Sequence, residues 1–109
     1  MKRGDVVLIV VPGELGKPRP GVVVQTDALG DVTTTVLVCP ITSDVTEHLP
    51  IRPLIDANAA NGLRIRSQVM TDKLLALRRD RIRRVVGRLD AKARDDLDRA
   101  LLIVLGLAR

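Results

Sequence analysis

Side chains suited to phosphate chemistry occur at three places in this 109-residue sequence. Cutting an RNA chain without a metal ion needs a base for the 2′-OH proton, an acid for the departing 5′ oxygen, and donors for the charged phosphorane. A carboxylate can act as the base, hydroxyls can orient a phosphate oxygen, and an arginine fork can hold two phosphate oxygens at once. The residues of these types are Glu14, Lys17, Arg19, Thr42, Ser43, Asp72 and Lys73.

Each of these residues also has a purely structural interpretation. Arg19 stands between two prolines, where an exposed loop residue without further function is common. Thr42 follows a proline closely and could cap the backbone of its own turn. Asp72 could be a solvated acid paired with Lys73 or with Arg66. Residue types alone leave both interpretations open.

An arginine-rich stretch, residues 78–88, contains six arginines and one acid, Asp80. It could be a solvated face balanced by the aspartates of the segment that follows, or a surface that faces a polyanion. The formal net charge of the chain is +5, which favours an anionic partner, either a nucleic acid or an acidic polypeptide.

Signatures of metal and cofactor chemistry are missing from the sequence. There is no glycine-rich phosphate loop, no nucleophile elbow and no helical pair of histidines. The single cysteine, Cys39, lies in an apolar run and is expected to be buried and inert. The single histidine, His48, is expected at the surface or in an edge strand rather than as a base. We therefore expect no disulfide framework, no metal site and no cofactor.

Composition indicates a single domain over residues 1–109 with an aliphatic core. Hydrophobic residues make up 46% of the chain, and there is no Phe, Trp or Tyr. Without aromatic rings to stack bases, an RRM or a typical single-strand-binding OB-fold is disfavoured. No apolar run approaches the ~20 residues that span a bilayer, and Gly4-Asp5 interrupts any signal-peptide pattern. We expect a cytoplasmic protein with no membrane partner.

Short β-branched runs predict strands in the first part of the chain. These runs are Val6–Val11, Gly21–Thr26 and Val32–Cys39, and Pro40 is expected to close the third. The segment Pro12–Pro20 contains three prolines and two glycines, so it is expected to be an exposed loop.

The middle of the chain is expected to form shorter elements. Two prolines restrict His48–Ile55 to an edge strand at most. Asp56–Leu63 has loop chemistry, with a turn signal at its Asn-Gly pair. Arg64–Leu77 predicts one or two short strands, one of which is expected to carry Asp72 and Lys73.

One strong helix signal occurs, near the end of the chain. Asp90 is a good N-cap, and Gly106 supplies the stop. Apolar residues at helical spacing follow the cap at Leu97, Ala100, Leu101, Val104 and Leu105. Further apolar residues widen this stripe beyond what one sheet face covers, which predicts a partner subunit; they are Leu102, Ile103 and Leu107. The predicted architecture is mainly β, a small antiparallel barrel with a C-terminal helix.

Five segments, taken in chain order, resemble the MazF/PemK family of toxin endoribonucleases, and together they cover nearly the whole chain. The tetrapeptide Pro-Ile-Thr-Ser at residues 40–43 is the most specific of the motifs. The five segments are Lys2–Val7, Arg19–Val24, Val38–Ser43, Gly62-Leu63 with Ser67–Lys73, and Val86–Asp90 with the helix that ends at Leu105-Gly106-Leu107.

This resemblance implies an SH3-like barrel of the CcdB/PemK type, a homodimer, and metal-independent cleavage of single-stranded RNA through the 2′-OH. It also implies control by an acidic antitoxin protein, as in type II toxin-antitoxin systems. By position, Arg19 and Thr42 match catalytic residues of the family, and Glu14 stands where many members have a loop glutamate. Asp72 matches an acid that serves as the base in part of the family. The residues expected to bind RNA are Lys17, Ser43, Gln68 and Lys73.

The chain departs from the family pattern at several positions. Lys73 replaces a frequent glutamine, Met70 stands where some members have arginine, and the first strand has Val7 and Leu8 instead of an aromatic residue. Two other functions stay open. The related CcdB proteins poison DNA gyrase without cutting RNA, through a C-terminal tryptophan that this chain lacks. A catalytically inactive, basic binding module is the third alternative.

Overall fold

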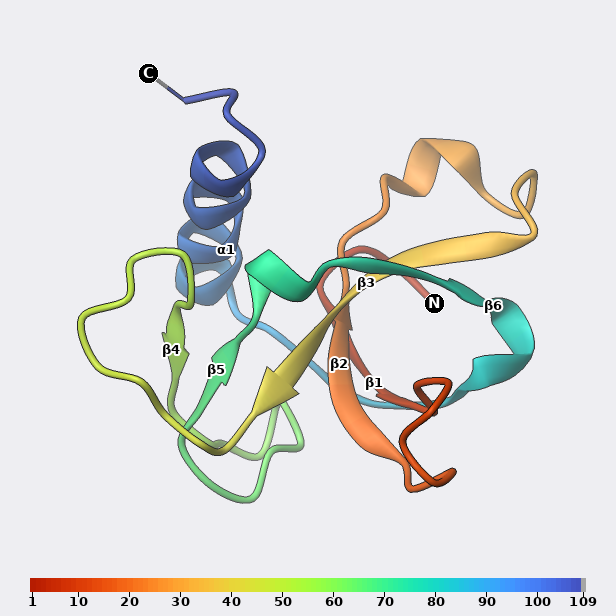
Figure 1. Cartoon of the computed structure of the whole chain (residues 1–109), viewed down its shortest axis with the longest axis horizontal. Helices are drawn as coiled ribbons and strands as arrows, with labels where there is room; N and C mark the ends of the chain where they lie inside the picture. Colours follow the sequence, from red (N-terminus) through yellow and green to blue (C-terminus); the bar gives the residue numbers. More distant parts are fainter. Residues whose placement is uncertain (109) are drawn as a thin grey trace.

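The computed structural model describes residues 1–108 and consists mainly of one antiparallel sheet that curls around itself (Figure 1). The helix α1 spans Ala91–Val104 and follows the last strand. The strands are β1 (Asp5–Ile9), β2 (Arg19–Val23), β3 (Thr35–Thr42), β4 (Leu54–Ile55), β5 (Ser67–Val69), β6 (Leu75–Arg78) and β7 (Ile82–Arg88). Three short 3-10 turns are η1 (Asp27–Leu29), η2 (Thr71–Lys73) and η3 (Arg79–Arg81).

β3 is the strand around which the sheet is organised. The strands pair in the order β4-β5-β3-β2-β1-β7, and β6 also pairs with β3. β1, β2, β3, β6 and β7 curl into a barrel on one side, while β4, β5 and α1 lie on the other (Figure 1). The predicted fold class, mainly β with an SH3-like antiparallel barrel and a C-terminal helix, is confirmed.

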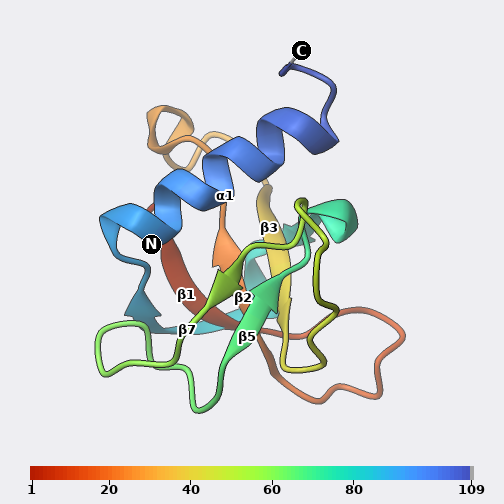
Figure 2. The same ribbon diagram turned by 90° about the vertical axis from the view of Figure 1, so that its left-hand side faces the viewer.

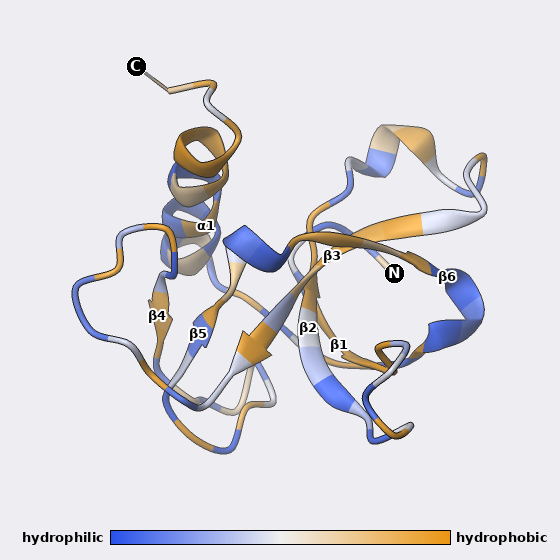
Figure 3. Cartoon of the chain, in the orientation of Figure 1, coloured by the Kyte–Doolittle hydropathy of each residue, from blue (hydrophilic) through white to orange (hydrophobic). Residues whose placement is uncertain are grey.

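The central strands are buried on both faces, which explains their continuous apolar runs. In β1, Val6 belongs to a core cluster beneath α1, and its neighbour Val7 belongs to a second cluster inside the barrel. In β3, Cys39 and Val38 divide between the two clusters in the same way. Figure 3 shows hydrophobic residues along β1 and alternating colours around α1, whereas η2 and η3 are hydrophilic.

The helix forms as its sequence predicts and covers one side of the sheet (Figure 2). The carboxylate of Asp90 accepts a hydrogen bond of 2.8 Å from the amide of Ala93, which caps the first turn. Leu97 and Leu101 are buried against the sheet, and Gly106 follows the last turn with φ of 72°. Within residues 1–108 no helix has the length and apolar character needed to cross a bilayer.

Two predicted boundaries are wrong. Arg19 and Pro20 belong to β2 rather than to the preceding loop, and Pro40 lies inside β3 rather than closing it. Pro40 is tolerated because it lies where β3 changes partner, after its pairing with β6 ends at Val38 and before its pairing with β5 begins at Ile41. Its missing N–H therefore interrupts no ladder on that side of the strand.

Two further expectations concern the middle of the chain. Asp72 and Lys73 lie in the 3-10 turn η2 and not in a strand. Where an edge strand was expected, the two-residue β4 does form the edge of the sheet beside β5. His48 is an exposed loop residue with φ of 59°.

The loop between β4 and β5, residues 56–66, packs backbone to backbone against β7. Asn61 is buried and organises this 56–66 loop: its side-chain oxygen accepts bonds from the amides of Asn58 and Leu63, and its amide nitrogen donates to the Asp56 carbonyl. The amide of Arg88 in β7 donates to the Ala60 carbonyl at 2.8 Å. The two segments are therefore joined by main-chain contacts.

Two glycines make this approach close enough. A Cβ on Gly62 would overlap the carbonyl group of Val86, and a Cβ on Gly87 would overlap the backbone of Asn61. Gly62 also has φ of 71°, a backbone conformation that residues with a side chain rarely adopt. The seam between the 56–66 loop and β7 therefore has no room for a side chain.

Replacing Gly87 with alanine tests this contact. We expect Gly87→Ala to lower the free energy of unfolding by about 1–3 kcal/mol, because the added methyl group forces the loop away from β7. Urea unfolding followed by circular dichroism measures the change. Ala59→Ser, a substitution at an exposed position of the same loop, is the control. Equal stability of Gly87→Ala and the wild type would contradict the close packing of the seam.

Candidate active site

A groove of about 660 Å³ lies between the barrel and the 56–66 loop. Leu8 from β1, Ile41 from β3 and Val86 from β7 give it an apolar lining. Four cationic side chains also line it, and none of the described lining residues is acidic. These cations are Lys17, Arg19, Arg64 and Arg84. The groove therefore combines an apolar surface with concentrated positive charge, which suits a polyanion that carries bases.

The pairing of β2 with β3 brings Arg19 and Thr42 to the same end of the groove. Arg19 is the first residue of β2, and Thr42 is the last residue of β3. The two strands are antiparallel and pair Gly21 with Pro40, so the start of β2 lies beside the end of β3. Both side chains line the groove, together with Ser43 and Lys17.

Glu14 joins this cluster through Arg19. Its carboxylate lies 3.1 Å from the Nε atom of Arg19, and both side chains are about half exposed. An ion pair this exposed contributes little to folding, so its partners are free to exchange for a ligand. Arg19 can therefore turn its fork from Glu14 to a phosphate without a large cost.

The hydroxyl of Thr42 has a defined orientation. The amide of Asp44 donates to Thr42 Oγ1 at 3.0 Å, so Thr42 does cap its turn, as the structural interpretation held. Because this bond uses the oxygen as an acceptor, the hydroxyl hydrogen stays available for donation. Thr42 therefore has a structural contact and a free donor at the groove.

Asp72 and Lys73 are not among the residues that line the groove. The carboxylate of Asp72 accepts two bonds from Arg52, of 2.9 and 2.8 Å, and not from Lys73 or Arg66 as expected. This bond from Arg52 holds the pKa of Asp72 below its usual range. A carboxylate that is bound bidentately and made less basic is a poor proton acceptor.

Gln68, expected to bind RNA, is 1% exposed and also lies outside the groove lining. Its side-chain amide is used within the protein. The oxygen accepts from the Thr46 amide, and the nitrogen donates to the carbonyls of Thr46 and Arg52. The side chain is therefore engaged by the backbone of the loop that follows β3 and is not free to bind RNA.

The sequence did not single out Arg64 or Arg84 as groove residues. Arg84 lies in the arginine-rich stretch, where Arg83 next to it is exposed but does not line the groove. A β-bulge in the pairing of β7 with β1 falls at Arg83, between residues 82 and 84. No pattern in the sequence distinguishes these adjacent arginines.

The rest of the arginine-rich stretch is divided between structural ion pairs and the surface. Arg88 pairs with Asp5 at 2.9 Å, and Arg78 pairs with Asp80. The aspartates of α1 have other partners: Asp98 pairs with Arg3, and Asp96 with Lys92 and Arg99. Among the described ion pairs, none joins this stretch to α1, so direct pairing with the helix aspartates does not support the first of the two alternatives.

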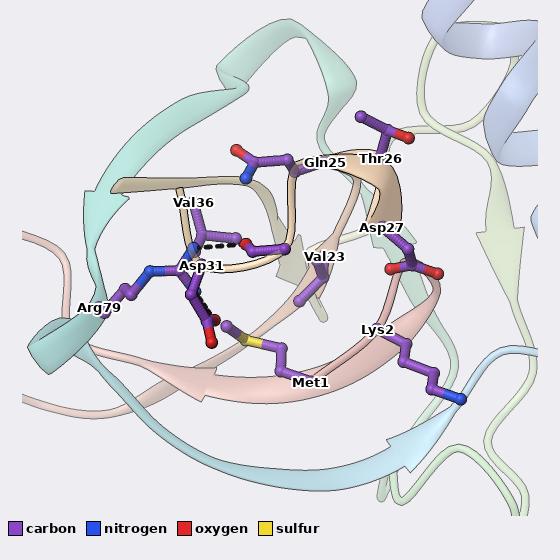
Figure 4. A pocket seen from close by; sticks show the side chains of 10 residues that line it. Met1, Lys2, Val23, Gln25, Thr26, Asp27, Asp31, Val36 and Arg79 are labelled. Carbon is purple, nitrogen blue, oxygen red and sulfur yellow. Dashed lines mark hydrogen bonds and ion pairs between the residues drawn. The ribbon is translucent and has the colours of Figure 1, made fainter. Parts of the chain in front are cut away.

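A second cavity, of about 500 Å³, lies at the opposite end of β2 and β3 (Figure 4). Its polar side chains hold the neighbouring loop together. Arg79 donates to the carbonyls of Gly30 and Thr33, and Gln25 bonds Thr33 and the amide of Leu37. Because these groups are already bonded within the protein, the groove is the better candidate site.

Cys39 is buried, as expected. Burial raises the pKa of its thiol to about 12, and nearby Arg3 opposes this only in part. The thiol is therefore protonated at neutral pH and is not a nucleophile. Among residues 1–108, no group of three or more His, Cys, Asp or Glu side chains is arranged to hold a metal ion.

Comparison with known proteins agrees with the sequence resemblance. The chain matches a family described as the PemK-like, MazF-like toxin of type II toxin-antitoxin systems over residues 2–105. It is 38% identical over 109 residues to the probable endoribonuclease MazF of Mycolicibacterium smegmatis, covering 99% of both chains. It is 31% identical over 112 residues to endoribonuclease EndoA of Bacillus subtilis, covering 98% of this chain and 96% of that one.

The fold is also shared with a solved structure of an endoribonuclease in complex with its cognate antitoxin from mycobacterial species. The TM-score is 0.83 at 20% sequence identity, and the match covers 100% of this chain and 98% of the other. The family match spans nearly the whole chain, and the fold agrees with it. The chain belongs to the PemK-like, MazF-like toxins of type II toxin-antitoxin systems.

Proposed function

We propose that this protein is a toxin endoribonuclease that cuts single-stranded RNA in the groove by attack of the 2′-OH, without a metal ion. The observation that carries this proposal is the meeting of Arg19 and Thr42 at one end of a groove lined by four cations and no described acid. The relatives named endoribonuclease, MazF of M. smegmatis and EndoA of B. subtilis, support the same activity.

In this mechanism the scissile phosphate lies between Arg19 and Thr42. The Arg19 fork and the Thr42 hydroxyl donate to the non-bridging oxygens, whose negative charge grows as the 2′ oxygen bonds to phosphorus. Glu14, released from Arg19 by the phosphate, accepts the 2′-OH proton. The bond from phosphorus to the 5′ oxygen then breaks, and that oxygen takes a proton from water in the open groove. The products are a 2′,3′-cyclic phosphate and a 5′-OH.

The other polar groups of the groove bind the RNA on either side of this phosphate. Lys17, Arg64 and Arg84 attract the flanking phosphates, and Ser43 adds a hydroxyl next to Thr42. The apolar lining provides contact area for bases in place of aromatic stacking. Asp72 is not assigned the role of base here, because Arg52 occupies both of its oxygens.

An acidic antitoxin would use the same charges. The solved complex of an endoribonuclease with its cognate antitoxin has the fold of this chain. An acidic segment that binds the cationic groove would exclude RNA by competition, and both affinities would fall with salt. We place the protein in the cytoplasm, where its RNA substrate and the antitoxin would meet. A gyrase poison that uses a C-terminal tryptophan is disfavoured because the chain contains none.

Cleavage of a long single-stranded RNA in EDTA tests the activity. We expect the wild type to cut it in EDTA and to leave 2′,3′-cyclic phosphate ends, because protein donors alone stabilise the phosphorane. Arg19→Ala should cut at least about 100-fold more slowly, as loss of one preorganised donor predicts. Mass spectrometry of the fragments identifies the ends. Cleavage that EDTA abolishes and Mg²⁺ restores would refute the mechanism, and an uncut RNA would favour an inactive binding module.

Arg84 and Arg83 form a matched pair for testing the groove. We expect Arg84→Ala to weaken binding of an uncleavable RNA and to reduce the slope of log affinity against log salt by about 0.7, as loss of one single-strand phosphate contact predicts. Arg83→Ala removes the same charge from the adjacent position and should change binding much less. Fluorescence anisotropy over a salt series measures both. Equal effects of the two substitutions would show that only net charge matters.

The end of α1 predicts self-association of the protein. Four apolar side chains there are between 45% and 67% exposed in the single chain, namely Leu102, Ile103, Leu105 and Leu107. Burying them in a homodimer would remove this apolar surface from water. Sedimentation velocity should show a dimer at concentrations on the order of 10 µM, and Ile103→Asp should shift it toward monomer. A monomeric wild type under these conditions would argue against this interface.

A further inference from the structure

The loop between β3 and β4, residues 43–53, begins immediately after Thr42. In the described part of the chain, the hydrogen bonds that fasten this loop to a segment distant in sequence all come from residues 68–72. Near its start, Gln68 bonds both the amide and the carbonyl of Thr46, at 2.6 and 2.8 Å. Near its end, Gln68 donates to the Arg52 carbonyl at 3.0 Å, and the Thr71 hydroxyl donates to the Ile51 carbonyl. The Arg52–Asp72 pair adds a further contact at that end.

Gln68 is placed to act on Thr42 although it does not reach the groove. The two residues are partners in the pairing of β3 with β5. The Gln68 side chain is 1% exposed, and all three of its hydrogen bonds go to main-chain groups of the 43–53 loop. A buried amide that is fully bonded in this way fixes the path of the backbone, since breaking its bonds would leave buried polar groups unpaired.

Hydrogen bonds connect the backbone held by Gln68 to the hydroxyl of Thr42. Thr46 is held by Gln68, and Asp44, two residues before it, donates its amide to Thr42 Oγ1 at 3.0 Å. That bond occupies one acceptor position on the oxygen and so limits the directions open to the hydroxyl hydrogen. If the loop moved away, the Asp44 amide would leave Thr42, and the hydroxyl could rotate.

We infer that Gln68 is a positioning residue for RNA cleavage: by holding Thr46, it keeps the Asp44 amide on Thr42 and aims the Thr42 hydroxyl at the scissile phosphate. The inference rests on the proposed function of Thr42. It assigns Gln68 a role in the chemical step rather than in RNA binding, because the groove cations do not depend on the 43–53 loop for their charge.

Gln68→Glu tests this role through the pH profile. The carboxylate keeps an acceptor for Thr46 but loses the donor for two carbonyls, whereas the protonated acid regains one donor. Burial beside carbonyls raises the pKa of the new group, so its protonated form persists to higher pH than that of an exposed glutamate. We expect kcat to fall roughly tenfold at pH 8 with KM nearly unchanged, as misplacement of one orienting group predicts. The ratio of variant to wild-type kcat should then rise as the pH is lowered to about 5.5.

Two other variants complete the test. The methionine of Gln68→Met has a similar length and no charge. We expect this variant to lose kcat to a similar degree, with a ratio of variant to wild-type kcat that does not change with pH. If Gln68→Glu does not fold, Gln68→Met alone tests the positioning role. Thr71→Val removes the bond to Ile51 at the far end of the loop and should lower thermal stability while leaving kcat unchanged. Hydrogen exchange of the Asp44 amide should accelerate in both Gln68 variants and not in Thr71→Val.

The outcomes separate this inference from the proposed function. If wild-type protein does not cut RNA, or Arg19→Ala cuts as well as wild type, the proposed function fails. If wild type is active and Arg19→Ala is inactive, but folded Gln68→Met keeps full kcat, only the positioning role fails. A loss that appears in KM, or an equal loss of kcat in Thr71→Val, would also overturn it, because each would indicate RNA contact or general loosening of the loop.

Discussion

The groove exists because the 56–66 loop packs against β7 with no side chain between the two backbones. Gly62 and Gly87 make this approach sterically feasible, and the bond from the Arg88 amide to the Ala60 carbonyl ties the segments together. The loop then presents Arg64 to the same cavity that Arg84 lines from β7. A side chain in the seam would push the wall outward, and the groove would widen and lose its shape. The placement of the cationic groove residues therefore depends on Gly62 and Gly87, which carry no functional side chain of their own.

The distribution of ion pairs gives the groove its charge. Most described acids pair with arginines elsewhere: Asp5 with Arg88, Asp98 with Arg3, and Asp72 with Arg52. Glu14 is the acid that pairs with a groove cation, and that pair is exposed on both sides. The lining of the groove thus holds four cations and no described acid, because many of the negative charges fasten other parts of the fold. An RNA chain and an acidic protein would both be attracted to this surface.

Local chemistry in the sequence predicted many elements correctly. Features that depend on neighbouring residues are revealed by short patterns. They include the cap at Asp90, the helix stop at Gly106, the burial of Cys39 and the turn at Asn61-Gly62. The short β-branched runs likewise predicted the first three strands, although not their exact bounds. Pro40 was misjudged because its effect depends on the partners of β3: the strand changes partner at that point, and nothing near Pro40 in the sequence shows this.

The sequence by itself determined the fold class, the family and the types of side chain that the site would need, because these follow from apolar periodicity and from motifs in chain order. Only the tertiary structure decided which of those side chains share the groove. Asp72 and Gln68 have suitable chemistry, yet Arg52 and the Thr46 backbone, distant in sequence, engage them elsewhere. Arg84 lines the groove and Arg83 does not, although the two are neighbours in β7 and alike in chemistry. Contacts between distant segments leave no periodic trace in the sequence, and here they decide which of many similar side chains line the groove.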